Sequence, residues 1–213
     1  MRVLKSVMEI DTPVGMARAH LWRPPRACGA VVLGHGAGGS SWSGDLQALT
    51  SLAARGWLVV LVEQPWRVAG RRVAMPAAQL DLAWLAVMAV LSSRRGALPR
   101  PWVVGGRSSG ARVACRTAAA VGADAVLAVS FPLHPPGRPE KSRASEARLV
   151  TDAGTRLVVI QGEKDPFGSP DEIRNALGTG AEVVAVRGTH SFRTPTDVLD
   201  AASIFLANLG TVW

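Results

Sequence analysis

The chain contains 213 residues, of which 48% are hydrophobic and 19% are charged. This length and hydrophobic content exclude a disordered chain and predict one folded domain, residues 1–213, that buries roughly 70% of its unfolded surface. The net charge of +8 comes mainly from arginine, which raises the possibility of a nucleic-acid-binding protein. The arginines are scattered, however, and tyrosine is absent, so no aromatic platform accompanies them. We therefore expect a solvated, arginine-rich surface and no nucleic-acid partner.

The sequence also bears on compartment and cofactors. No apolar run approaches the ~20 residues of a membrane-spanning helix. The N-terminal residues lack the uninterrupted apolar stretch of a signal peptide. The two cysteines, Cys28 and Cys115, do not have the spacing of metal ligands. These features predict a cytoplasmic protein with reduced cysteines, no membrane partner, no metal and no cofactor, and they leave the oligomeric state open.

Short apolar segments alternate with helix-compatible segments along the first half of the chain. Residues 2–10 and 14–22 predict two strands joined by a turn. The remaining predicted elements of this half are a buried strand at 30–33, a helix at 44–55 that Gly56 ends, a buried strand at 57–62, a loop at 63–76 and a long amphipathic helix that ends near Arg95.

The second half continues the alternation of strands and helices. Its predicted elements are strands at 101–104, 125–130, 156–160 and 182–186, helices at 111–121, 144–150, 172–177 and 196–209, and a proline-rich loop at 131–142. This order predicts an α/β fold with a mostly parallel central sheet and helices on both faces. In such sheets the functional site lies beyond the carboxyl ends of the strands.

The segment Gly-Gly-Arg-Ser-Ser-Gly at 105–110 contains the pattern Gly-x-Ser-x-Gly between a predicted strand and a predicted helix. In that context the pattern is typical of a sharp turn that exposes a nucleophilic serine. Strand and helix nearly touch at such a turn, so small residues are needed two positions before and after the nucleophile. Gly106 and Gly110 meet this need for Ser108, whereas Ser109 would have larger residues there. We therefore interpret Ser108 as the candidate nucleophile.

A serine hydroxyl is a poor nucleophile and needs a base, usually a histidine that a carboxylate orients. His190 follows the last predicted strand, and no other histidine follows a late strand. Asp165 follows the preceding strand and is the candidate carboxylate. Glu163 and Asp171 compete with it, although Asp171 could instead cap the next helix. Because each candidate follows a strand, Ser108, Asp165 and His190 should meet at one edge of the sheet.

Three segments carry a family resemblance: His-Gly-Ala-Gly-Gly at 35–39, Gly-Gly-Arg-Ser-Ser-Gly-Ala-Arg at 105–112 and Phe-Pro-Leu-His-Pro-Pro-Gly at 131–137. Together with the chain order serine, aspartate, histidine, they resemble the α/β-hydrolase superfamily over essentially the whole chain. The chain looks most like small, lidless bacterial members related to dienelactone hydrolases, in particular the group of testis-expressed protein thirty. Dienelactone hydrolases use cysteine where this chain has Ser108.

The resemblance implies that the serine, histidine and aspartate named above form a catalytic triad. It also implies an oxyanion hole, in which two backbone N–H groups face the oxygen that becomes negative. One donor should be Ser109, the residue after the nucleophile. The other should come from the loop at 34–39, where Ala37 follows His-Gly and Gly38 is the alternative.

Other side chains have more than one interpretation. His134 lies in the proline-rich loop and could line the substrate pocket or only fold that loop. Arg67 follows a strand at the same sheet edge, as do Arg71 and Arg72, and could favour an anionic substrate or lie in a solvated loop. His35 is expected to organise its own loop through hydrogen bonds.

About 25 residues separate the predicted strand that ends near Ser130 from the one that begins near Arg156, too few for a cap domain with its own core. We therefore expect an uncapped site and a small acyl substrate. The resulting hypothesis is a serine hydrolase that cleaves an ester or related acyl compound. The alternative is a non-catalytic interaction module that keeps the hydrolase fold.

Overall fold

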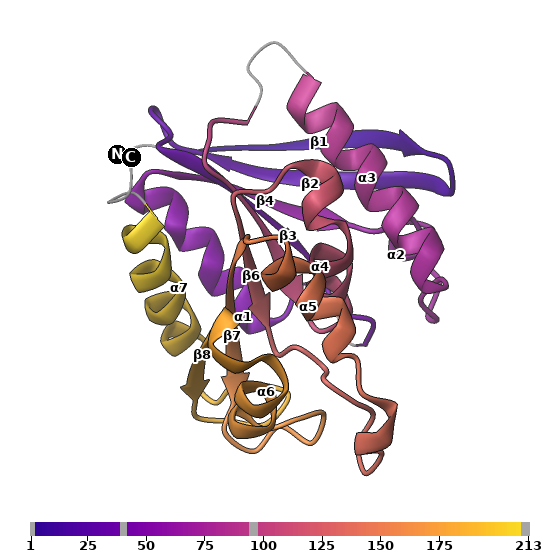
Figure 1. The fold of residues 1–213 in the computed structure, drawn as a ribbon. Helices are drawn as coiled ribbons and strands as arrows, with labels where there is room; N and C mark the ends of the chain where they lie inside the picture. Colours follow the sequence, from indigo (N-terminus) through magenta and orange to yellow (C-terminus); the bar gives the residue numbers. More distant parts are fainter. Residues whose placement is uncertain (1–2, 39–41, 94–97, 210–213) are drawn as a thin grey trace.

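The computed structural model describes residues 3–38, 42–93 and 98–209, and their centre is one eight-stranded sheet (Figure 1). The strand order is β1-β2-β4-β3-β5-β6-β7-β8. β2 pairs antiparallel with both β1 and β4, and all other neighbours are parallel. The strands are β1 Leu4–Thr12, β2 Gly15–Arg23, β3 Gly29–Gly34, β4 Trp57–Glu63, β5 Trp102–Arg107, β6 Ala125–Val129, β7 Arg156–Gly162 and β8 Ala181–Val186.

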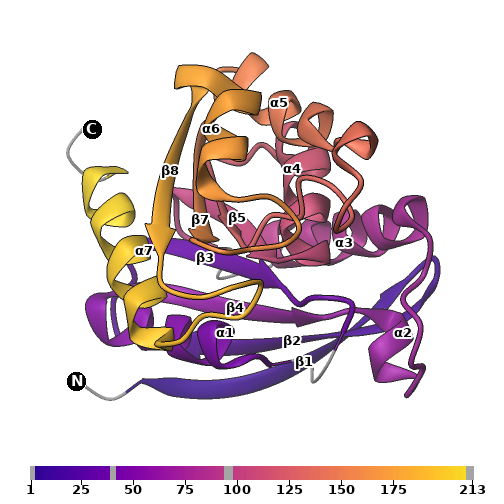
Figure 2. The same cartoon turned by 90° about the horizontal axis from the view of Figure 1, so that it is seen from below.

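Helices cover both faces of this sheet, because its central strands are apolar on both sides. All residues of β3 and β6 are buried. One face packs against α1, η1 and α7, and the other packs against α3, α4, α5 and α6 (Figures 1 and 2). The helices are α1 Gly44–Leu49, α2 Pro65–Val68, α3 Ala77–Ser93, α4 Ser109–Val121, α5 Ala144–Asp152, α6 Pro170–Leu177 and α7 Pro195–Leu209, with 3₁₀ turns η1 Thr50–Arg55, η2 Pro139–Lys141 and η3 Gly178–Gly180.

The predicted α/β class, with a mostly parallel sheet between two helical layers, is confirmed. Every parallel strand ends at the same edge of the sheet, so the loops after β3, β5, β6, β7 and β8 are neighbours. In Figure 2 the loop between β8 and α7 crosses in front of the sheet. The absence of a cap domain is also confirmed, because residues 130–155, between β6 and β7, hold only η2 and α5.

Three local predictions need correction. The central strand β5 continues past residue 104 to Arg107, because Gly105 and Gly106 still pair with β3 and β6. The predicted helix at 44–55 changes after Leu49 to the 3₁₀ turn η1, which ends at Gly56 in a left-handed conformation (φ 93°). The loop at 63–76 contains the short helix α2, which begins with a proline at its first position. The predicted helix end near Arg95 lies outside the described residues.

Candidate active site

The turn between β5 and α4 places the candidate nucleophile. Ser108 has φ 53° and ψ −110°, a strained backbone conformation, and its N–H donates to the Val129 carbonyl at 2.9 Å. A Cβ atom on Gly106 would lie 2.4 Å from the Gly34 carbonyl oxygen, and one on Gly110 would lie 2.3 Å from the same oxygen. Larger residues at these two positions would therefore push β3 away from the turn. This geometry is that of a nucleophile elbow.

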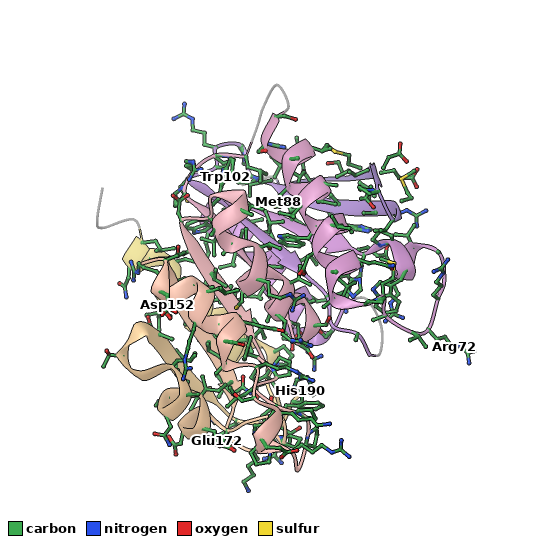
Figure 3. All side chains as sticks on the ribbon, turned by 45° about the vertical axis from the view of Figure 1, so that its right-hand side comes forward. Arg72, Met88, Trp102, Asp152, Glu172 and His190 are labelled. Carbon is green, nitrogen blue, oxygen red and sulfur yellow. The ribbon has the colours of Figure 1, made fainter. Side chains whose placement is uncertain are left out.

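The loops after β5, β7 and β8 bring the three candidate side chains together. His190 Nε2 lies 2.9 Å from Ser108 Oγ, and His190 Nδ1 lies 2.9 Å from Asp165 Oδ2 and 3.2 Å from Asp165 Oδ1. A carboxylate only accepts hydrogen bonds, so Nδ1 carries a proton and its N–H donates a hydrogen bond to Asp165. Nε2 is then free to accept the hydrogen bond of the Ser108 hydroxyl. In Figure 3 His190 lies far from Trp102, which begins β5, consistent with a site at the carboxyl ends of the strands.

The carboxylate of Asp165 is fully buried and saturated with donors. Its Oδ1 accepts the Phe167 N–H at 2.9 Å, and its Oδ2 accepts the Gln161 side-chain amide at 2.9 Å in addition to His190. Gln161 is itself completely buried. These bonds fix the position of the carboxylate that the imidazole contacts.

The two competing carboxylates are occupied elsewhere or face solvent. Glu163 is exposed, and Asp171 is exposed and paired with Arg174 at 2.7 Å. Asp171 lies in the first turn of α6, where an acidic side chain stabilises the helix N-terminus, but it is not the N-cap residue. Ser169 is the N-cap of α6 and forms a reciprocal capping box with Glu172, because a hydroxyl one position before the helix reaches the third N–H of the helix.

A cavity of about 290 Å³ opens beside Ser108 and includes Ser109 and Ala37 in its lining. Ser109 is the first residue of α4, so its N–H has no partner within the helix. Ser109 and Ala37, the two residues expected to supply the oxyanion hole, therefore both border the cavity beside Ser108. Gly38 is not among the lining residues. Gly39, the last residue of the predicted loop, lies outside the described residues.

One wall of this cavity is apolar, with Met75, Leu80 and Phe167 among its residues. The Phe167 ring also packs against the His190 imidazole, with 4.3 Å between the ring centroids. This contact helps to keep the imidazole in place, and the apolar wall offers a surface for the hydrocarbon part of a substrate.

The lining of the same cavity also contains three arginines: Arg112, Arg116 and Arg143. Arg112 and Arg116 share the Glu146 carboxylate at 2.6 Å and 3.1 Å. Arg116 also forms two hydrogen bonds to Asp81, at 2.6 Å and 2.8 Å. Burial acts to raise the pKa of Glu146, but the hydrogen bonds and charges of the two arginines outweigh it and hold that pKa below its ordinary value. The network joins α3, α4 and α5 around the cavity.

The remaining candidates lie outside this cavity lining. The His134 ring contacts the Pro135 carbonyl at 2.9 Å and Glu172 at 3.2 Å. Arg67 stacks on Trp66, and its Nη2 lies 3.5 Å from the Ala37 carbonyl. Figure 3 shows Arg72 well apart from His190.

His35 ties the loop after β3 to β4. Its Nε2 accepts the Gln64 N–H at 3.0 Å, so the other ring nitrogen, Nδ1, donates to the Gly36 carbonyl at 2.7 Å. Burial lowers the pKa of His35, which is consistent with a neutral ring. As expected, His35 organises its own loop.

Arg107 is a site residue that sequence reasoning missed. It stands between Gly106 and Ser108, and its guanidinium donates to Asp45 at 3.0 Å, to the His190 carbonyl at 2.6 Å and to Ser191 Oγ at 3.2 Å. These partners lie 62 or more positions away along the chain. The Gly-x-Ser-x-Gly pattern predicts the turn around Arg107, but nothing in the sequence predicts these side-chain contacts.

Among the described residues, no cluster of three or more histidine, cysteine, aspartate or glutamate side chains could hold a metal ion. Within the same part of the chain, no helix is both long and apolar enough to cross a membrane. Both cysteines are free thiols, and burial raises the pKa of Cys115 to about 12.

Comparisons with known proteins agree with this fold. The family model described as the alpha/beta hydrolase domain matches residues 27–201. Among solved structures, a lidless α/β serine hydrolase from Xanthomonas campestris is 19% identical with a TM-score of 0.75, and the alignment covers 98% of this chain and 96% of that one. Est1E from Butyrivibrio proteoclasticus is 17% identical, with a TM-score of 0.75 and coverage of 95% and 98%.

A dienelactone hydrolase from Anabaena variabilis is similarly related, at 18% identity, a TM-score of 0.73 and coverage of 96% and 95%. Comparison with curated protein sequences finds none that matches the chain. At these identities the solved structures establish the fold, whereas the family model covers most of the chain. The chain therefore belongs to the α/β-hydrolase family.

Proposed function

We propose that this protein is a serine hydrolase that cleaves esters of small acyl groups. The observation that carries the proposal is the continuous hydrogen-bonded series from Ser108 through His190 to the buried carboxylate of Asp165. This arrangement supplies a nucleophile, a base with a defined tautomer, and a group that stabilises the charged imidazole.

In the proposed reaction, Ser108 Oγ attacks the ester carbonyl while His190 Nε2 takes the hydroxyl proton. The negative oxygen of the tetrahedral intermediate is held by the N–H groups of Ser109 and Ala37. The imidazolium then gives its proton to the leaving alcohol, and an acyl-enzyme remains. In the second half of the reaction, water loses a proton to His190 Nε2 and attacks the acyl carbon. The bond from that carbon to Ser108 Oγ then breaks, the imidazolium returns its proton to Oγ, and the acid and free enzyme are released.

The substrate should be small because the site has no cap and the cavity is about 290 Å³. A long acyl chain would leave most of its methylenes in water and forgo ~0.8 kcal/mol of binding for each one. The apolar wall around Leu80 and Phe167 suits a short hydrocarbon segment. Acetyl to hexanoyl esters are therefore the expected range.

The test combines turnover with covalent labelling. Release of p-nitrophenol is measured for acetyl to palmitoyl esters, and a fluorophosphonate probe reports whether Ser108 is reactive. Turnover of short esters together with labelling that depends on Ser108 would support the proposal. A wild-type protein that neither turns over any ester nor takes the probe would contradict it and favour the non-catalytic interaction module.

A further inference from the structure

One arginine side chain links the nucleophile turn to the loop that carries His190. Arg107 ends β5 and directly precedes Ser108, and its side chain is only 12% exposed. Its Nη2 donates to the main-chain carbonyl of His190 at 2.6 Å and to Ser191 Oγ at 3.2 Å. The residue that directly precedes the nucleophile therefore contacts the main chain of the base.

The orientation of this guanidinium is set from its other side. Arg107 Nε donates to Asp45 Oδ2 at 3.0 Å, and the Asp45 side chain is 4% exposed. Asp45 Oδ1 accepts the Leu46 N–H at 2.7 Å and a hydrogen bond from Ser43 Oγ. The carboxylate is thus fixed at the start of α1, and a charge-assisted pair of this kind holds a planar guanidinium in one direction.

His190 needs this support because it lies in a loop between β8 and α7. Its imidazole must reach Ser108 and Asp165 at the same time, at 2.9 Å each. Its carbonyl oxygen is held by Arg107 and also by Ser130 Oγ at 3.3 Å. A displacement of about 1 Å in a reacting group can cost ~10²-fold in rate. Fixing the main chain of His190 is therefore a direct way to fix the base.

We propose that Arg107, oriented by Asp45, is a positioning residue that holds His190 in register with Ser108. His190 is then fixed at two points, at its ring by Asp165 and at its main chain by Arg107. A lysine cannot replace this function fully, because one ammonium group cannot reproduce the planar fork that joins Asp45 to the loop. This inference rests on the proposed function for its kinetic readout, but not for its spectroscopic one.

The experiment compares Arg107→Met and Arg107→Lys with a matched control, Arg100→Met. Arg100 precedes the opposite end of β5 and also pairs with an aspartate, Asp124, through two hydrogen bonds of 2.7 Å and 2.8 Å. Steady-state kinetics on a short p-nitrophenyl ester separate kcat from KM. The ¹H NMR resonance of the proton between His190 Nδ1 and Asp165 reports the position of the ring without any turnover.

We expect Arg107→Met to lower kcat by ~10²-fold with little change in KM, and to broaden or abolish the imidazole resonance. Arg107→Lys should fall between this variant and the wild type. Arg100→Met should retain both kcat and the resonance, even if its melting temperature falls. The proposal is overturned if Arg107→Met is folded and keeps a sharp imidazole resonance, or if it and Arg100→Met lose kcat equally. A wild type without ester turnover would refute the proposed function, while the resonance would still decide the role of Arg107.

Discussion

Replacing Asp165 with asparagine tests whether this carboxylate sets the tautomer of His190. Both oxygens of Asp165 accept hydrogen bonds, Oδ1 from the Phe167 N–H and Oδ2 from Gln161 and His190. The side chain is fully buried, so water cannot replace a lost partner. Asparagine has nearly the same shape but offers one acceptor and one NH₂ donor. In the variant, the new NH₂ group must therefore face at least one of the three donors that now bind the carboxylate: Phe167, Gln161 or His190.

Either orientation of the new amide impairs the base. With the NH₂ at the Oδ2 position, His190 Nδ1 must become an acceptor, so Nε2 carries the proton and cannot take one from Ser108. With the NH₂ at the Oδ1 position, it faces the Phe167 N–H, at a cost of about 1 to 3 kcal/mol. Gln161 cannot turn to relieve the first arrangement without losing its hydrogen bonds to the carbonyls of residues 131 and 168. In both orientations the neutral amide no longer stabilises the imidazolium.

We expect kcat/KM of Asp165→Asn to fall by ~10⁴-fold, the effect of the same exchange in a Ser-His-Asp protease. This loss corresponds to about 5 kcal/mol of transition-state stabilisation. The assay is p-nitrophenyl acetate hydrolysis, with circular dichroism as the folding check. Glu163→Gln and Asp171→Asn are the controls, and each should stay within about threefold of wild type because both side chains are exposed. A loss of less than tenfold in Asp165→Asn, or an equal loss in either control, would refute the assignment.

Four further outcomes are expected. Ser108→Ala should abolish phosphonate labelling and lower turnover by ~10⁶-fold, and labelling that survives it but disappears in Ser109→Ala would reverse the choice of nucleophile. Specificity across acetyl to palmitoyl esters should be highest for short chains without a rate increase at the micelle threshold, so a maximum at long chains would contradict the uncapped site. Glu146→Gln should lower the free energy of unfolding at neutral pH by about 1 to 3 kcal/mol. Since Arg112 and Arg116 hold the pKa of Glu146 below its ordinary value, their stabilisation is present above pH 4.5 and lost as the pH falls further. The free energy of unfolding of the variant, measured by chemical denaturation, should therefore fall less steeply below pH 4.5 than that of the wild type. Gel-shift assays at physiological salt should detect no specific DNA or RNA binding, and micromolar affinity would contradict the dispersed-charge interpretation.

The fold and the candidate triad residues could be predicted from the sequence because their signals are local. Apolar strand segments such as those of β3 and β4 are short and continuous, so they mark a parallel sheet without knowledge of their neighbours. Gly106 and Gly110 lie within two residues of Ser108 and report the close approach of strand and helix directly. The position of His190 just after the last strand marks it as a candidate, because parallel strands end at the same edge of the sheet.

Local sequence signals do not predict contacts between side chains that are distant in the sequence. Arg107 and Asp45 are 62 positions apart, and neither residue type is unusual in its local context. Arg116 and Asp81 are 35 positions apart and meet only because α3 packs against α4. The sequence could show many arginines, but only the packing of helices shows which of them border the nucleophile.

This difference separates the part of the fold that carries the proposed reaction from the part that selects the substrate. The candidate triad sits on loops that follow β5, β7 and β8, and the order of strands determines their meeting. Much of the cavity lining, in contrast, is supplied by residues of α3 and α4 and by Arg143, just before α5. Two chains can therefore share the sheet and the triad while their helices present different walls to the substrate. The solved structures that are 17% to 19% identical share the fold of this protein, whereas the side chains that line the cavity select the substrate.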